Sequence, residues 1–161
     1  MSGSPTYETA NTKVWFLRTG PDSGGEVHEQ RVEYRPNSQF PPSQFHPAQE
    51  EHFEIESGEM LVVLAGDKHL LSAGETIHIP AGQPHKMRNP SADVAAVVVW
   101  ETRPALRTTE FNEIGSRLSG GIIDRALFAH EYRDVFRLPG FQGVLVPLLA
   151  KLGSRLGRRL R

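Results

Sequence analysis

Two histidines and a carboxylate lie in two short segments whose spacing could bring them together. His46 and Glu51 are five residues apart, and Pro47-Ala48 supplies the turn that would let both side chains converge. His85 directly follows a Gly-Gln-Pro corner at 82–84, from which another strand could deliver it to the same place. Two imidazoles and one carboxylate form a first-row metal site with open positions. Such a site can bind O₂, chelate a substrate or act as a Lewis acid.

Two further residues are candidates for a role in this site. Glu50 precedes Glu51 and is also within turn reach of the first histidine, so it is an alternative ligand. His78 alternates with Ile77 and Ile79 and must share the opposite face of its strand. If that face lines a pocket, His78 can contact substrate or act as a general acid or base; a surface or packing role is the alternative. Glu51 and His78 are therefore the candidate catalytic residues.

The chain from Lys13 to Arg103 predicts the β-structure that would position these groups. Short apolar runs alternate with Gly- and Pro-containing turns, which indicates an antiparallel sandwich or barrel. The expected strands are Val14–Arg18, Val27–Tyr34, His52–Ile55, Met60–Leu64, His69–Leu71, Thr76–Ile79 and Val94–Trp100. Residues 1–12 are small and polar and are expected to form a flexible N-terminus.

A helical pattern begins at Pro104. One amphipathic helix is expected from Thr109 and a second from Asp124, and Val144–Leu160 predicts a third. Residues 104–161 are thus expected to form an extension that packs on the barrel or on a partner subunit. Because apolar helices on a small barrel need somewhere to bury their stripes, we expect a homodimer.

Composition narrows the class of protein further. With 161 residues and 38% hydrophobic content, the chain can bury a single sizeable core. The net charge of −1 argues against a dedicated nucleic-acid binder. The absence of cysteine excludes disulfides, zinc fingers and a thiol nucleophile. The polar N-terminus lacks the features of a secretory signal, so a cytoplasmic location is expected.

The segment from about Pro41 to Glu101 resembles the cupin superfamily. The family's second motif, G-x5-P-x-G-x2-H-x3-N, is matched at every fixed position: Gly74, Pro80, Gly82, His85 and Asn89. The first motif, G-x5-H-x-H-x3,4-E-x6-G, is matched at His46, Glu51 and Gly58, whereas Ser38 and Gln44 replace its leading glycine and first histidine. The chain is also similar to small bacterial single-domain cupins that append C-terminal helices after an Arg-Pro-Ala-Leu-Arg junction, here at 103–107.

The resemblance implies a fold, a ligand set and a class of function. The fold would be an all-β antiparallel, jelly-roll-like barrel with a central pocket and appended helices. Carried over by position, the metal ligands would be Gln44, His46, Glu51 and His85, and the step from Glu51 to Gly58 favours Glu51 over Glu50. The metal would be a divalent ion such as Fe, Mn, Ni or Zn.

Two functions follow from that ligand set. The first is a metal-dependent enzyme, a dioxygenase or an isomerase or cyclase, that acts on a small oxygenated metabolite. The second is a non-catalytic cupin that binds or senses a small molecule. The neutral amide of Gln44, in place of an imidazole, favours the second.

The basic C-terminal tail allows two interpretations. Residues 151–161 contain five cations and no acid, and an apolar stripe runs beside them, formed by Leu148, Leu149, Leu152, Leu156 and Leu160. Such a helix can attach to an anionic membrane surface or to nucleic acid. We favour packing on the barrel or on a partner subunit, because the rest of the chain is net negative and offers an acidic surface.

Overall fold

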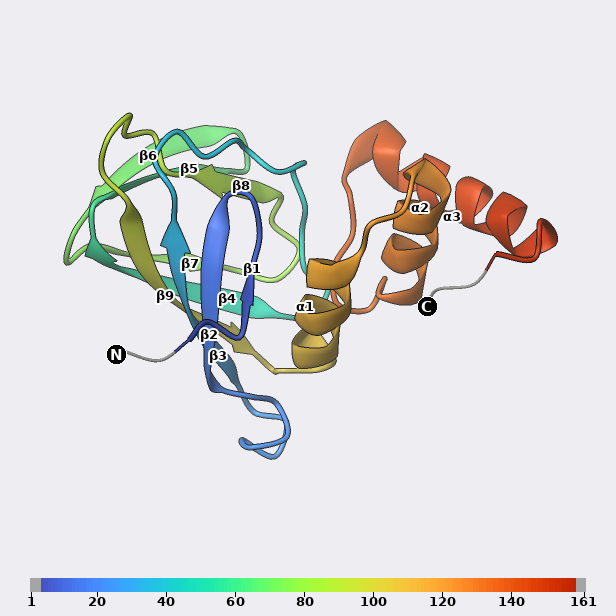
Figure 1. Ribbon diagram of the computed structural model, residues 1–161, viewed down its shortest axis with the longest axis horizontal. Helices are drawn as coiled ribbons and strands as arrows, with labels where there is room; N and C mark the ends of the chain where they lie inside the picture. Colours follow the sequence, from blue (N-terminus) through green and yellow to red (C-terminus); the bar gives the residue numbers. More distant parts are fainter. Residues whose placement is uncertain (1–3, 159–161) are drawn as a thin grey trace.

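Two antiparallel sheets dominate the computed structural model, which describes residues 4–158 (Figure 1). The larger sheet has the order β1-β2-β3-β9-β4-β7 and the smaller has the order β6-β5-β8. The strands are β1 (Tyr7–Glu8), β2 (Thr12–Arg18), β3 (His28–Tyr34), β4 (Glu50–Ser57), β5 (Glu59–Leu64), β6 (Asp67–Ser72), β7 (Thr76–Ile79), β8 (His85–Arg88) and β9 (Ala96–Arg103). This arrangement confirms the predicted antiparallel β-fold of the cupin, jelly-roll type.

The hydrophobic core lies between the two sheets. Alternation along β4 turns Phe53 and Ile55 inward, and they meet Met60 and Val62 of β5 across the interior. All four side chains are at most 1% exposed. The same alternation places Glu51 on the inner face, because it lies two residues before Phe53.

Two residues of the sequence motifs serve the barrel itself. Gly58 lies between β4 and β5 with φ +74, and a Cβ there would lie 2.6 Å from the carbonyl oxygen of Ala95. Only glycine fits this tight connection. Asn89 is fully buried, and its Nδ2 donates to the carbonyl of Val94 at 2.8 Å, which holds the loop that leads to β9.

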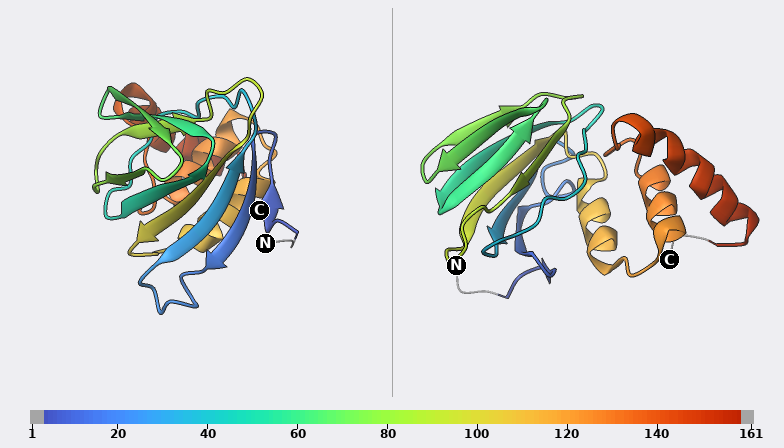
Figure 2. Two further views of the ribbon diagram at one scale, coloured as in Figure 1. Left: turned by 90° about the vertical axis from the view of Figure 1, so that its left-hand side faces the viewer. Right: turned by 90° about the horizontal axis from the view of Figure 1, so that it is seen from above.

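Three helices follow the barrel and extend from one end of it (Figure 2). They are α1 (Thr108–Arg117), α2 (Ile122–Glu131) and α3 (Gly140–Arg155). A second core forms where α1 meets α2 and the segment after it, from aromatic rings at Phe111, Phe128, Tyr132 and Phe136. None of the helices described is long and apolar enough to cross a membrane.

Several boundaries differ from the sequence-based expectation. Tyr7 and Glu8 pair with β2, so part of the N-terminal stretch expected to be flexible joins the sheet, whereas residues 1–3 lie outside the described part. The strand suggested after the Gly-Gln-Pro corner is β8, which was given no bounds because its short polar run carries no strand pattern of its own. Asp124 does not cap α2 as the first residue but lies within its first turn, where its carboxylate accepts from the Gly121 N–H at 3.1 Å.

Candidate metal centre

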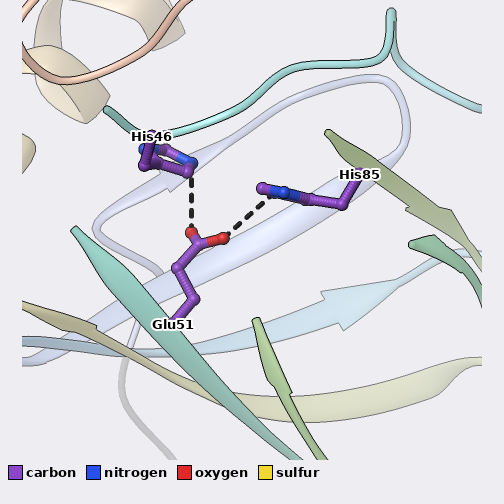
Figure 3. Close-up of side chains that lie close together, drawn as sticks. All are labelled: His46, Glu51 and His85. Carbon is purple, nitrogen blue, oxygen red and sulfur yellow. Dashed lines mark ion pairs between the residues drawn. The ribbon is translucent and has the colours of Figure 1, made fainter. Parts of the chain in front are cut away.

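The structure brings together the three residues whose spacing suggested a metal site. Glu51 comes from the start of β4, His85 from the start of β8, and His46 from the loop that precedes β4 (Figure 3). One candidate ligand atom from each residue lies within 4.8 Å of the other two. His46 Nε2 is 3.2 Å from Glu51 Oε1, and His85 Nε2 is 3.0 Å from Glu51 Oε2.

Short backbone contacts orient both imidazole rings. His46 Nδ1 lies 2.8 Å from the carbonyl oxygen of Val135, and His85 Nδ1 lies 3.0 Å from that of Gln83. A carbonyl oxygen only accepts, so both Nδ1 atoms carry the proton. When the rings are neutral, each Nε2 atom therefore carries a lone pair that faces the carboxylate. Histidines that bind metals typically have this arrangement, with Nδ1 donating to an acceptor and Nε2 free to bind the ion.

Because the cluster is buried, it is stable only with a positive charge between its ligand atoms. Glu51 is 1% exposed, and neither its Oε2 atom nor His46 Nε2 has a partner with hydrogen-bond geometry among the described residues. Two lone pairs that face a buried carboxylate repel it unless a proton or a cation lies between them. Two imidazoles and one carboxylate suit a first-row divalent ion. These residues therefore fit the metal that the cupin resemblance implies.

The protonation of the metal-free site reflects the same electrostatics. Burial favours the neutral ring of His85, but the contact with the Glu51 carboxylate outweighs burial and raises the pKa of His85. Burial likewise favours the protonated acid at Glu51. The facing rings of His46 and His85 outweigh this effect and, with the indole of Trp100, hold the pKa of Glu51 below its ordinary value.

Trp100 is a member of the site that sequence reasoning missed. Its Nε1 donates to Glu51 Oε1 at 3.0 Å and fixes the carboxylate on the side away from His85. Trp100 lies within β9, opposite Phe53 of β4, and its position in an apolar run suggested only core packing. Sequence reasoning also missed the carbonyl of Val135, because every residue has a backbone carbonyl and the residue type does not show which one accepts a hydrogen bond.

Gln44 lies beside the cluster on the wall of a cavity. Its backbone forms two hydrogen bonds with His85, of 3.0 and 2.7 Å, so the two residues are adjacent across an antiparallel bridge. Both line a cavity of about 330 Å³, and so does Trp100. Polar residues elsewhere on its wall are Tyr7, Thr9, Asn11, Thr12, Gln30, Tyr34, Ser38, Gln39, Lys86 and Asn112. Two of the four candidate ligands, Gln44 and His85, therefore line a space large enough for a small molecule.

His78 is not brought to this cluster. It pairs with His52 across β4 and β7, and its side chain is 52% exposed. Its Nε2 lies 3.2 Å from Glu50 Oε2, which is also exposed. The strand face opposite Ile77 and Ile79 is thus the solvent face, so we assign neither His78 nor Glu50 a part in the site.

The fold and the site together describe a two-sheet β-barrel with a buried candidate metal site formed by two histidines and a glutamate. The family model of the Cupin domain matches residues 30–101, and structures with the same arrangement of strands are cupins. This part of the chain is a cupin domain, as its motifs predicted.

Solved structures agree on the fold. KdgF from Halomonas sp. is 15% identical, with 67% of this chain and 99% of that chain covered and a TM-score of 0.55. TT1209 from Thermus thermophilus is 22% identical, with 61% and 88% covered and a TM-score of 0.53. The polyketide cyclase RemF from Streptomyces resistomycificus is 25% identical, with 63% and 69% covered and a TM-score of 0.50. A search of curated protein sequences finds no significant match.

Proposed function

We propose that this protein is a metal-dependent cupin enzyme that acts on a small oxygenated metabolite in its barrel cavity. The observation that carries the proposal is the convergence of His46, Glu51 and His85 at a buried point beside that cavity. A divalent metal held there would supply Lewis acidity toward a substrate oxygen. Fe, Mn, Ni and Zn are all compatible with two imidazoles and one carboxylate.

In this proposal, residues of the cluster and of the cavity wall have separate roles. Glu51 stays ionised because the facing rings lower its pKa, and it supplies the negative charge of the site. The carbonyls of Val135 and Gln83 keep both imidazoles turned toward it. Tyr34 on the cavity wall is protonated at neutral pH, as any tyrosine is, and burial raises its pKa further, so its hydroxyl could donate to a substrate oxygen.

Cyclisation or isomerisation is the reaction type we place first. RemF is a polyketide cyclase and is one of the more similar solved structures in sequence, at 25% identity. The cavity wall is rich in neutral polar groups, which can fold and orient an oxygenated substrate. Dioxygenation uses the same class of ligands and is the alternative within the enzyme proposal.

A non-catalytic binding or sensing cupin is the second candidate function, and Gln44 favours it. An amide oxygen is a weaker ligand than an imidazole. Gln44 would then serve as a hydrogen-bonding group on the cavity wall rather than as a ligand.

Metal content tests the enzyme proposal directly. Protein expressed with all four candidate metals supplied and purified without chelator should carry about one metal ion per chain, as measured by mass spectrometry. His85→Ala should lose that metal, whereas His69→Ala, an exposed position on β6, should keep it. A wild-type protein without metal would leave the binding function in first place.

The affinity for metal should also depend on pH in a defined direction. Metal binding requires neutral His85, and Glu51 raises the pKa of that ring in the metal-free protein. Protons therefore compete from a higher pH than for an ordinary histidine, whose pKa is about 6.5. Below the raised pKa of His85, the affinity for metal should fall about tenfold per pH unit for each proton that the metal displaces. Above that pKa, the affinity should no longer change with pH. Competition titrations with a chelating dye between about pH 5 and 8 measure this. A flat profile would contradict the ligand set.

A further inference from the structure

Helix α3 is apolar on both of its long faces, and only one of them is covered. On the inner face, Ala150 and Gly153 are buried against α2. A Cβ at Gly153 would lie 2.6 Å from the side chain of Ile123, so the two helices are in close contact along this face. A helix that is apolar all round is normally buried all round.

The outer face of α3 is exposed along its whole length. Five large apolar side chains recur at helical spacing and are 47–74% exposed: Phe141, Val144, Leu148, Leu152 and Leu156. We call these five the outer stripe. α3 is the outermost element of the molecule, with α2 between it and the barrel (Figure 2). Contiguous exposed apolar surface of this kind marks an interaction site.

The charge around the outer stripe is positive. Lys151 and Arg155 each lie three residues after a leucine of the stripe and therefore border it. The sequence contains no Asp or Glu after Asp134. An apolar groove of about 200 Å³ between α2 and α3 adjoins the stripe, and its lining includes Arg125. A partner of this face must therefore be apolar in its interior and anionic at its surface.

We propose that the outer stripe binds the surface of an anionic lipid bilayer. α3 would lie in the plane of the membrane, with its apolar side chains at the boundary of the acyl chains and Lys151 and Arg155 at the lipid phosphates. Because the inner face of α3 stays packed on α2, the contact is one-sided and leaves the barrel in water.

A second copy of the chain fits this face less well. Self-pairing of the stripe would bring Lys151 and Arg155 of two copies to an interface to which α3 contributes no acid. The homodimer expected from the sequence would then use another surface. The proposal is independent of the proposed function, since the stripe contains no residue of the metal centre.

Vesicle flotation with the full chain tests the proposal. The protein should float with phosphatidylcholine vesicles that contain about one third phosphatidylglycerol, should not float with pure phosphatidylcholine, and should dissociate as salt is raised. Lys151→Glu/Arg155→Glu should weaken binding at least about 25-fold, because each cation contributes roughly fivefold near such a surface. Lys68→Glu/Arg117→Glu changes the net charge equally at exposed sites elsewhere and should have a much smaller effect.

A second pair of variants tests the apolar contribution. Leu148→Asp/Leu152→Asp should abolish flotation, whereas Leu70→Asp, at a residue 57% exposed on β6, should not. Circular dichroism should show that all variants fold. Unchanged flotation of the stripe variants, or no flotation of the wild type, would overturn the proposal. So would light scattering that shows a wild-type dimer split by Leu148→Asp/Leu152→Asp without vesicle binding, since the stripe would then be a self-interface.

Discussion

Replacing Glu51 with glutamine should reduce the affinity for metal at least about 100-fold and abolish any metal-dependent turnover. Loss of a partner outside the ligand set costs roughly 10- to 100-fold, so loss of the charged ligand itself should cost no less. Glutamine preserves the volume and the acceptor for the Trp100 indole, so the change removes charge rather than packing. Isothermal titration with Zn²⁺ and Mn²⁺ measures the loss.

Glu50→Gln is the matched control for this change. Glu50 precedes Glu51 in the sequence but points to solvent, where its carboxylate faces His78. The control should bind metal as the wild type does. If Glu50→Gln lost the metal while Glu51→Gln kept it, the ion would lie on the outer face of β4 and the buried cluster would have another purpose.

The choice between these two carboxylates shows how much of the site the sequence could predict. Alternation along β4 buries Glu51, Phe53 and Ile55 and exposes Glu50. Period-two patterning is local, so the strand and its inner face can be inferred from the residues alone. The cupin motifs then add His46 and His85, which no local pattern places next to Glu51. The fold and the cluster of candidate metal ligands could therefore be predicted from the sequence.

Two other points could not be predicted from the sequence: that His78 lies outside the site, and that the helical extension orients His46. Period-two patterning also placed His78 on the face opposite Ile77 and Ile79, but the pattern does not say which face of β7 the barrel encloses. The role of the extension was hidden for a different reason. Val135 holds His46 through a backbone carbonyl 89 positions away, and a backbone group is the same in every residue type.

That contact makes the helical extension part of the candidate metal centre. The segment after α2 forms a bridge in which Phe45 and Arg137 exchange two backbone hydrogen bonds of 2.9 Å. His46 follows directly, and its ring is held by the carbonyl of Val135, which is fully buried in the second core. The aromatic rings of that core thus fix the position of a candidate ligand in the barrel.

Phe128→Ala should therefore lower both the stability and the affinity for metal. Phe128 is 7% exposed, and its ring packs against Phe111 and Tyr132 with ring centroids 5.0 and 4.9 Å apart. Removal of a buried phenylalanine ring costs about 3–5 kcal/mol of unfolding free energy. Loosening the carbonyl that orients His46 should cost roughly 10- to 100-fold in metal affinity. Urea unfolding of the metal-free protein and metal titration of the folded protein measure the two effects separately.

Ile122→Ala on the same helix is the control, because Ile122 is 70% exposed and should change stability by less than about 0.5 kcal/mol. If Phe128→Ala unfolds in two stages, the helical core should unfold first while the barrel core stays folded. The affinity loss should then follow the unfolding of the extension, since His46 would lose its carbonyl partner while Glu51 and His85 stay in place. If metal affinity stayed unchanged after the extension had unfolded, the loop and the barrel alone would orient His46, and the helices would have no part in the centre.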